Sequence, residues 1–329
     1  MTLEDDYRAI RETAAVGSIA VRSQVAVTGQ DRAAYLQGLL TNDIPALVPG
    51  TGCYSAWLSP QGRMLTDMHV LQSASMILLD LPAETATATV ERLDKFIFSE
   101  DVQVGSMADA LTGVWTHGPG AADVLERSLE GAAGLAAFQG YQHAQLAFGG
   151  AAVSVARIDQ LGVPGYCVFL ERSREADLVE ALRSAGAHAA GQDALDAARI
   201  EAGYPVFGVD MTDATIPLEA GIEGRAISFS KGCYVGQEVV IRVLHRGGGR
   251  VARKLVAMRV DGSQPHRGAK LFGGGREIGA VTSAAVSPRL GSIALGYVHR
   301  DFVAAGTAIE VEGEGGRRPA VVAELPLST

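Results

Sequence analysis

The spacing of apolar and polar residues switches between a helical and a strand period several times along the first 250 positions. Residues 4–15 carry apolar side chains at helical spacing, whereas Ile19, Val21, Val25 and Val27 alternate as in a half-buried strand. The same patterns predict further helices at 32–40, 83–98, 121–130, 174–186 and 192–202. They predict further strands at 52–58, 63–71, 76–81, 101–104, 111–116, 141–148, 151–157 and 165–171. Strands interleaved with helices on short loops indicate an α+β body with mostly antiparallel sheets.

The character of the chain changes after Gly247-Gly248-Gly249. From there on, short β-type runs are separated by Gly, Pro and Ser, and they lie at 255–260, 280–286, 293–298, 308–311 and 320–323. Many short strands with turn residues between them are typical of a small β-barrel or sandwich. The pattern therefore predicts a domain boundary near residues 247–250.

Composition and charge narrow the class of protein. The chain has 329 residues, which fits two or three domains, and its net charge of −9 opposes a nucleic-acid coat. The opening segment MTLEDDYRAI is acidic without an apolar core, and no apolar run approaches the ~20 residues of a membrane helix. We therefore expect a cytoplasmic protein. Three widely spaced cysteines and scattered histidines offer no metal-ligand spacing, so we expect no metal site built from this chain alone.

The strongest local motif is Lys-Gly-Cys-Tyr-Val-Gly-Gln-Glu at residues 231–238. Cys233 lies beside Lys231, with Arg242 and Arg246 downstream, so it is a candidate reactive thiolate, because nearby positive charge lowers a thiol pKa. The alternative is a buried structural cysteine, which is common for an unpaired Cys. The residues alone favour that second interpretation. The segment that starts at Gln237 is expected to open a short helix or a strand.

A second motif, Arg-Ile-Glu-Ala-Gly-Tyr-Pro at residues 199–205, closes a predicted helix. Gly203 suits the position just after a helix C-terminus, with Pro205 beyond it. Glu201 is a candidate acceptor for the amino-pyrimidine edge of a pterin. The alternative is an ordinary ion pair with Arg199 or another base, and the residues alone favour the ion pair.

Three further segments carry polar residues whose role the residues alone leave open. Asp67 follows the hairpin turn at residues 59–62 and alternates with apolar neighbours, so it faces either a cavity or solvent. Residues 35–43 form, by themselves, a helix followed by an Asn-Asp turn. The basic residues between 242 and 254 can hold a polyanion, although a solvated charged face is the simpler interpretation.

Together these segments resemble the YgfZ family, folate-binding proteins related to the glycine-cleavage T-protein (aminomethyltransferase). Residues 231–238 match that family's K-G-C-[FY]-x-G-Q-E signature without a mismatch, and residues 200–205 resemble its I-E-A-G-[FY]-P segment. Tyr35–Asp43, Gly62-Arg63-Met64 and Arg246-Gly247 are also similar to family segments. The segments come in family order and cover most of residues 15–255.

The resemblance implies a fold and a ligand. The fold is a folate-binding α+β body of two intertwined subdomains at 1–248 and a C-terminal β-barrel at 249–329, arranged around a central channel. The implied ligand is tetrahydrofolate or a one-carbon derivative of it. The implied folate contacts are Glu201, as the pterin-binding carboxylate, together with Asp67, Tyr204 and Arg246. The aromatic residues that are candidates to pack on the pterin are Tyr54, Trp57 and Tyr204.

The resemblance also implies a cellular role. Lys231 and Cys233 match the family's functional lysine and cysteine. Lys231 and Arg246 are expected either to bind the glutamyl carboxylates of folate or to raise the thiolate fraction of Cys233. The implied partners are iron–sulfur enzymes or their assembly factors, including enzymes that thiolate tRNA, reached transiently through Cys233. Direct contact with tRNA is not expected, because the net charge opposes it.

One departure from the T-protein pattern separates two functions. T-proteins carry Asp-Asp in the hairpin strand, and this chain has Thr66-Asp67, so Thr66 replaces the aspartate associated with aminomethyl transfer. T-proteins also lack the Lys-Gly-Cys signature. We therefore expect an accessory protein without independent turnover. The alternative is a tetrahydrofolate-dependent aminomethyltransferase-type enzyme, which Asp67 keeps open.

Overall fold

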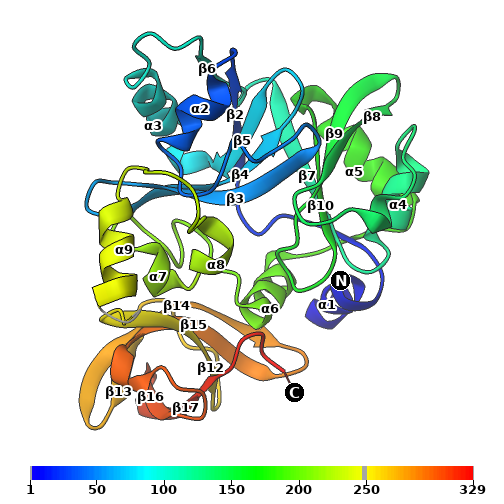
Figure 1. Cartoon of the computed structure of the whole chain (residues 1–329). Helices are drawn as coiled ribbons and strands as arrows, with labels where there is room; N and C mark the ends of the chain where they lie inside the picture. The colour runs from blue at the N-terminus through cyan, green and yellow to red at the C-terminus, as the bar shows by residue number, and fades with distance from the viewer. Residues whose placement is uncertain (1, 247–249, 329) are drawn as a thin grey trace.

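The computed structural model describes residues 2–246 and 250–328, and within them the strands form three sheets (Figure 1). The first sheet has five antiparallel strands in the order β3-β4-β5-β2-β6. In chain order its strands are β2 (Arg22–Thr28), β3 (Thr51–Leu58), β4 (Met64–Gln72), β5 (Ile77–Pro82) and β6 (Gln103–Ser106). The β3–β4 hairpin and the strand at 77–82 therefore lie where the apolar alternation predicts them.

The second sheet has six strands in the order β11-β1-β7-β10-β9-β8. Its strands are β1 (Ala15–Val16), β7 (Leu111–His117), β8 (His143–Phe148), β9 (Ala151–Arg157), β10 (Gly165–Glu171) and β11 (His188–Ala189). The β1–β11 pair is parallel and the other pairs are antiparallel. The two sheets of the body lie side by side in the upper part of Figure 1.

The third sheet closes on itself as a six-stranded barrel in the order β12-β15-β14-β13-β16-β17. Its strands are β12 (Arg253–Val260), β13 (Lys270–Gly273), β14 (Arg276–Ser287), β15 (Gly291–His299), β16 (Ala308–Gly313) and β17 (Gly316–Ala323). The predicted α+β fold with antiparallel sheets and a C-terminal barrel is confirmed. The predicted boundary at 248/249 falls on Gly247–Gly249, outside the described residues.

The helices cover the body and join it to the barrel. They are α1 (Leu3–Glu12), α2 (Arg32–Gln37), α3 (Ala83–Asp94), α4 (Ala121–Ser128), α5 (Glu175–Ser184), α6 (Gln192–Ala202), α7 (Pro217–Ala220), α8 (Glu223–Ala226) and α9 (Gln237–Arg246). Helix α6 lies between the body and the barrel in Figure 1, and it packs against α1, β14 and β15. None of the described helices combines the length and the apolar character needed to cross a membrane.

Local sequence signals explain where α1 and α6 begin and end. Thr2 caps α1: its hydroxyl accepts from the Asp5 N–H, and the Asp5 carboxylate reaches back to the Thr2 N–H. Helix α6 ends at Gly203, which has φ of +70°, a left-handed conformation that costs glycine little. The chain therefore turns sharply into Tyr204, and this turn aims Tyr204 at the interior of the body.

Several predicted elements differ from the structure. The helix predicted at 83–98 ends at Asp94; beyond it the Phe96 ring contacts Trp57 and Ile97 packs against the same core, whereas Phe98 is exposed. Of the two alternatives predicted for the segment from Gln237, the helix is confirmed, as α9. Strand β13 was not predicted, because its four residues between glycines are too short to show a period and depend on pairing with β14 and β16.

Candidate functional site

A cavity of about 290 Å³ lies where the two body sheets meet the chain that follows α6. Its walls come from the approach to β2, from β4, from the β5–α3 junction and from residues 204–209. The polar side chains that line it are Arg22, Asp67, Glu84, Gln160 and Tyr204. We call it the Asp67 cavity, and it brings together two of the residues singled out in the sequence, Asp67 and Tyr204.

Strand alternation decides which of Thr66 and Asp67 faces this cavity. Successive side chains of a strand point to opposite faces of its sheet, so only one of the two can point inward. The Thr66 hydroxyl lies 2.8 Å from the Thr85 hydroxyl of α3, whereas Asp67 lines the cavity. The replacement at position 66 therefore leaves the cavity-facing carboxylate in place.

Asp67 is buried but only partly satisfied. Its Oδ2 accepts a 2.6 Å hydrogen bond from the Tyr54 hydroxyl, and burial beside that carboxylate raises the pKa of Tyr54 well above its usual range. Its Oδ1 lies 3.6 Å from Nη1 of Arg22 and has no hydrogen-bond partner among the described residues. Buried polar atoms are almost always paired, so an unpaired carboxylate oxygen on a cavity wall indicates a ligand.

Two more unpaired polar atoms lie near Asp67. The side-chain oxygen of Gln160, on the same cavity wall, accepts no hydrogen bond from the described residues. Arg225 is buried between two aromatic rings, with its guanidinium carbon 4.7 Å from the Tyr54 ring centre and 4.1 Å from that of Tyr204. Its Nη2 is likewise unpaired within the described chain. The stacked rings fix the guanidinium in place, because a cation is attracted to aromatic faces.

A buried hydrogen-bonded chain continues from Tyr204 away from the cavity. The Tyr204 hydroxyl lies 3.3 Å from Nε2 of His69, and Nδ1 of His69 lies 2.8 Å from Oδ2 of Asp80. Asp80 is fully buried and also accepts hydrogen bonds from Arg22 (2.6 Å) and Gln24 (2.9 Å). Burial alone would raise the pKa of Asp80, but Arg22 and these hydrogen bonds bring it below its usual value. Asp80 is therefore ionised at neutral pH.

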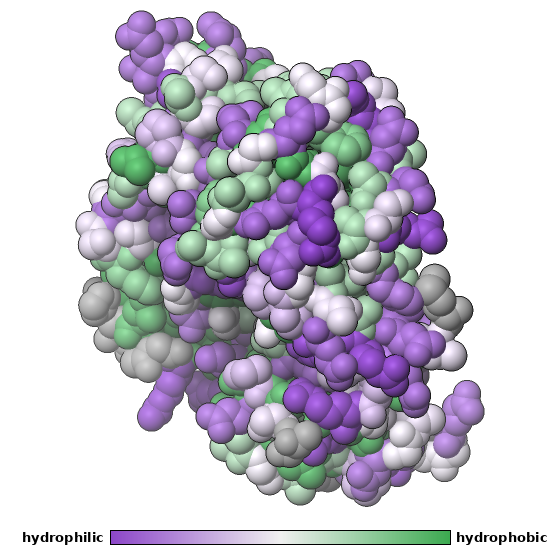
Figure 2. All heavy atoms as spheres, turned by 90° about the vertical axis from the view of Figure 1, so that its right-hand side faces the viewer, coloured by the Kyte–Doolittle hydropathy of each residue, from purple (hydrophilic) through white to green (hydrophobic). Residues whose placement is uncertain are grey.

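Glu201 is not among the residues that line the Asp67 cavity, and its role as a pterin contact stays a prediction. Its side chain is 2% exposed and lies between α1, α6 and the barrel. Its carboxylate accepts hydrogen bonds from Tyr7 (2.9 and 2.8 Å), Arg11 (2.8 Å), Arg289 (2.9 Å) and the Ser287 hydroxyl. Four protein groups leave little capacity for a ligand. On the face seen in Figure 2, hydrophilic residues gather where the body meets the barrel.

Lys231 also has a different environment from the one expected. Its side chain is buried, and its ammonium donates to the backbone carbonyls of Gln37 (2.7 Å), Leu40 (2.6 Å) and Asn42 (2.8 Å). An ammonium has three donors, so all of them are used by the turn after α2. Burial lowers the pKa of Lys231 to about 8, so it stays charged at pH 7. This arrangement holds a loop in place, in contrast to the expected contact with glutamyl carboxylates.

Cys233 lies two residues further on, and its side chain is exposed and unpaired with another cysteine. The described residues contain no hydrogen bond between the Lys231 ammonium and the Cys233 sulfur. Arg246 is the last residue of α9, and its side chain lies outside the described part of the structure. The structure therefore joins Asp67 with Tyr204 but groups neither of them with Glu201, and it leaves Cys233 at the surface. Within the described ranges, no cluster of three or more His, Cys, Asp or Glu is arranged to hold a metal ion.

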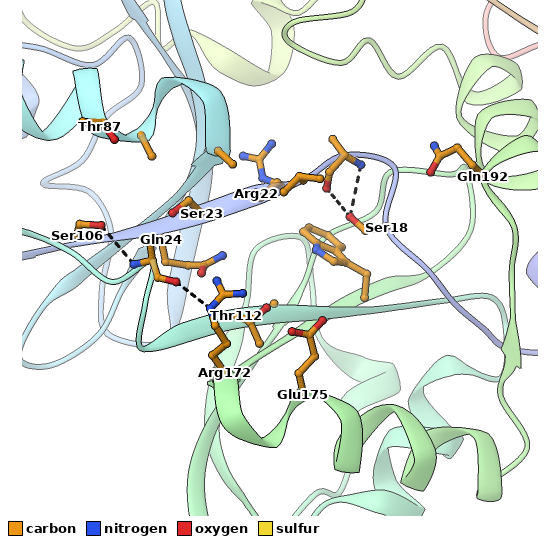
Figure 3. A pocket seen from close by; sticks show the side chains of 17 residues that line it. Ser18, Arg22, Ser23, Gln24, Thr87, Ser106, Thr112, Arg172, Glu175 and Gln192 are labelled. Carbon is orange, nitrogen blue, oxygen red and sulfur yellow. Dashed lines mark hydrogen bonds between the residues drawn. The ribbon is translucent and has the colours of Figure 1, made fainter.

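A second cavity, of about 490 Å³, adjoins the first along residues 20–22 and Ala83 (Figure 3). Its labelled side chains come from β2 and the residues before it, from α3, β6, β7 and α6, and from Arg172 and Glu175 just before and at the start of α5. The Ser23 hydroxyl and the Gln24 side-chain oxygen, both on buried residues of its wall, have no partner among the described residues. The two cavities thus flank the first residues of β2.

Sequence reasoning missed most polar partners in this region. His69 and Asp67 are two residues apart on an otherwise apolar strand, so they share a face, and Asp80 is the register partner of His69 on β5. Polar residues at alternate positions of two adjacent buried strands are a signal that was available. Gln160 and Arg225 gave no such signal, because they reach the site from loops and a four-residue helix.

Comparison with known proteins places this architecture in a family. The pattern of the GCVT N-terminal domain matches residues 1–231, and the glycine cleavage T-protein C-terminal barrel domain matches residues 253–328. The chain therefore belongs to the glycine cleavage T-protein family. The predicted resemblance to this superfamily is confirmed, whereas membership of the YgfZ subfamily stays a prediction.

Individual relatives agree over nearly the whole chain. The aminomethyltransferase of Streptomyces coelicolor is 29% identical, covering 98% of this chain and 88% of the relative, and that of Nostoc is 27% identical, covering 98% and 86%. The crystal structure of the glycine cleavage system aminomethyltransferase T of Bartonella henselae superposes with a TM-score of 0.87 at 26% identity. The superposition covers 98% of this chain and 89% of the Bartonella henselae chain.

Proposed function

We propose that the Asp67 cavity binds a reduced folate and that this chain transfers a one-carbon unit on it, in the manner of an aminomethyltransferase. The observation that carries the proposal is Asp67, a buried carboxylate on the cavity wall whose Oδ1 has no hydrogen-bond partner among the described residues. The proposal also has the support of the relatives over nearly the full chain, which bear the name aminomethyltransferase. The glycine cleavage T-protein family uses tetrahydrofolate, which fits the chemistry of this cavity.

The cavity offers acceptors, and a reduced pterin offers donors. Asp67 and Gln160 present free oxygens, and a pterin carries an amino group and ring N–H groups along one edge. Arg225 supplies a free donor for the carbonyl oxygen of the same ring, and the rings of Tyr54 and Tyr204 hold that donor in place. A carboxylate that accepts from N–H donors makes the stronger, charge-assisted kind of hydrogen bond.

The transfer itself is a substitution at carbon. Two folate nitrogens act in turn on the methylene carbon of an aminomethyl donor. The first attacks that carbon, and the bond from the carbon to its carrier breaks, with the carrier taking the electron pair and a proton. The second nitrogen then displaces the amine, which leaves as ammonia, so that the carbon bridges both nitrogens as methylenetetrahydrofolate. Asp67 is suited to hold the attacking nitrogen and to stabilise the positive charge that develops on it. No oxidation or reduction is involved, so no redox cofactor is needed.

Anaerobic calorimetric titration with tetrahydrofolate tests the binding step. We expect saturable binding to the wild type and at least a tenfold weaker affinity for Asp67→Asn, because a hydrogen bond to a charged group contributes about 1.5–3 kcal/mol. Thr66→Ala is the matched control, since Thr66 points to the opposite face and should leave affinity within about twofold. Equal affinity of wild type and Asp67→Asn would place the folate elsewhere.

Formation of methylenetetrahydrofolate from an aminomethyl donor tests the transfer step. We expect turnover by the wild type and loss of at least two orders of magnitude in Asp67→Asn, since positioning and electrostatic contacts at a reacting centre carry effects of that size. Folate binding without turnover would count against the transferase and in favour of an accessory role.

The second candidate is an accessory function in the biogenesis or maintenance of iron–sulfur enzymes, as the similarity to the YgfZ family implies. It is favoured by one observation: Cys233, within the matching Lys-Gly-Cys segment, is exposed and available to a partner. Cells that lack the wild-type copy and carry Cys233→Ala should then lose iron–sulfur enzyme activity, including tRNA thiolation. Full activity with Cys233→Ala would remove this candidate, and a filter-binding assay without salt-sensitive affinity would remove direct tRNA binding.

A further inference from the structure

Three side chains form a continuous hydrogen-bonded line from the interior of the body to the wall of the Asp67 cavity. Asp80 and His69 are fully buried, and Tyr204 is 7% exposed and lines the cavity. The donor–acceptor distances along the line are 2.8 Å from His69 Nδ1 to Asp80 and 3.3 Å from His69 Nε2 to the Tyr204 oxygen. The line connects two body strands, β4 and β5, with the turn that follows α6.

The chemistry of these groups fixes where each proton lies. An ionised carboxylate only accepts, so Nδ1 of His69 must carry the proton that it shares with Asp80. A neutral imidazole then has a lone pair on Nε2, and the Tyr204 hydroxyl must donate to it. The Tyr204 oxygen is left with lone pairs alone. Any further hydrogen bond that it makes must therefore be accepted, either from the neighbouring Gln160 side chain on the same cavity wall or from a ligand.

The surroundings keep His69 neutral. The rings of Tyr54, Trp115 and Tyr141 surround the imidazole at centroid distances of 5.8–6.0 Å. Burial and the charge of Arg22 lower the pKa of His69, against the opposing effect of the carboxylates. The charged or titratable groups that face it are Arg22 from β2, Asp67 from its own strand, Asp80 from β5, Tyr54 from β3, Tyr141 and Tyr204. The Nε2 lone pair of this neutral imidazole accepts the hydrogen bond from Tyr204, so the Tyr204 proton has an acceptor in place.

We propose that Asp80, His69 and Tyr204 form a proton relay for the transfer reaction, with Tyr204 as the group that touches the folate. The relay rests on the proposed function. When the folate nitrogen forms its new bond to carbon, its N–H proton passes to the Tyr204 oxygen, while the Tyr204 proton passes to His69 Nε2. Asp80 stabilises the imidazolium, and the reverse transfers then deliver the proton to the departing group. Protons and electron pairs balance, and Tyr204 remains neutral throughout.

The proton positions give a test that does not depend on turnover. In protein with ¹⁵N-labelled histidine, NMR should report His69 with a protonated Nδ1 and an unprotonated Nε2. Tyr204→Phe should shift the Nε2 signal, because it deletes the donor but keeps the ring. Tyr166→Phe is the matched control, since it also deletes one buried hydroxyl, which donates to the Leu135 carbonyl in a separate core. A protonated Nε2 in the wild type would overturn the relay.

Kinetics separate proton transfer from a purely structural role. We expect Tyr204→Phe to bind tetrahydrofolate within about threefold of the wild type and to lose at least 30-fold in kcat, because positioned acid–base groups contribute about 10²–10⁴-fold. The pH dependence of kcat should also change in Tyr204→Phe and stay unchanged in Tyr166→Phe. An unchanged kcat in Tyr204→Phe overturns the relay. If the wild type binds folate without turnover, the relay is overturned but the proposed folate site is retained. If the wild type does not bind folate, the proposed function itself is overturned.

Discussion

Asp67 and Glu201 are two buried carboxylates of one chain with opposite hydrogen-bonding states. Glu201 accepts from four side chains that belong to α1 and to the barrel. Asp67 accepts one hydrogen bond, from Tyr54, and its other oxygen has only the Arg22 guanidinium at 3.6 Å and no hydrogen-bond partner among the described residues. A satisfied buried charge holds elements together, whereas an unsatisfied one is costly unless a ligand pairs with it. Both carboxylates are buried and both are implied folate contacts, so we use the number of hydrogen bonds that each accepts from the protein to separate a structural role from a proposed ligand-binding role.

The largest expected effect on stability is at Glu201. Glu201→Gln keeps the shape but removes the charge that pairs with Arg11 and Arg289, and it turns one acceptor into a donor. We expect a loss of about 3 kcal/mol in the free energy of unfolding, measured in urea, because uncompensated charges remain in a partly buried site. Folate affinity of the folded protein should stay unchanged. Glu4→Gln, on the exposed side of α1, is the control; a folate defect in Glu201→Gln at full stability would reverse the comparison.

The loss of stability at acid pH tests His117, a buried titratable side chain that lines neither of the two cavities. His117 is fully buried, and Nε2 of its ring lies 3.0 Å from the Gly17 carbonyl. Burial lowers its pKa to about 4 from an ordinary 6.5. Below pH 6.5 the unfolded chain takes up a proton that the folded protein refuses, so stability is lost as the pH falls towards 4, by up to about 3 kcal/mol.

The variant His117→Gln keeps a donor for the Gly17 carbonyl and does not titrate. Its unfolding free energy should therefore fall by less than that of the wild type between pH 6.5 and pH 4. His266→Gln, at an exposed position, serves as the control. An acid profile that is identical in His117→Gln and wild type would contradict the assignment.

Lys231 extends the comparison to a buried cation that is fully satisfied. Lys231→Met leaves three carbonyls after α2 without their donor, and we expect a loss of about 2 kcal/mol in unfolding free energy. Cys233 should at the same time react at a changed rate with a thiol reagent, since its loop loses its anchor. Lys254→Met, on the barrel, is the control. Undiminished stability in Lys231→Met would show that the ammonium is not the anchor.

The smallest expected effect on stability is at Asp67. Asp67→Asn should change the unfolding free energy by less than about 1 kcal/mol, because the amide oxygen can still accept from Tyr54 and no complete pairing is lost. The same variant is the one expected to weaken folate binding most. Should Asp67→Asn destabilise the protein more than Glu201→Gln does, the two carboxylates would have to exchange roles.

Most helices and strands could be predicted from the sequence, because they depend on local patterns of apolar and turn residues. Alternation located the strands around the 59–62 turn, and Gly203 located the end of α6. Strand β13 escaped prediction because its pairing partners, and not its own four residues, make it a strand. Local propensity carries no information on such long-range pairing.

Only part of the candidate site could be predicted from the sequence. Asp67 was identified, but whether it faced a cavity or solvent stayed open until its strand was placed against Tyr204 and the loop that contains Gln160. The resemblance to the family implied that Glu201 binds the pterin, which stays a prediction. Its hydrogen-bond partners in the protein include Tyr7 and Ser287, which are 194 and 86 residues away along the chain. Partners at such separations are set by packing of whole elements, which a motif of six residues does not encode.

The junction at Glu201 has a consequence for the order in which the protein is made. Its carboxylate takes Tyr7 and Arg11 from the first helix, but Ser287 and Arg289 are synthesised more than 80 residues after Glu201 itself. The Glu201 backbone carbonyl accepts from the N–H of Leu327, which is synthesised later still. During translation α1 and α6 therefore meet around a half-satisfied anion. The body reaches its final stability only when the barrel has been made. A chain on a ribosome that stalls before residue 287 would therefore lack the Ser287 and Arg289 contacts of Glu201 and be more open to proteases.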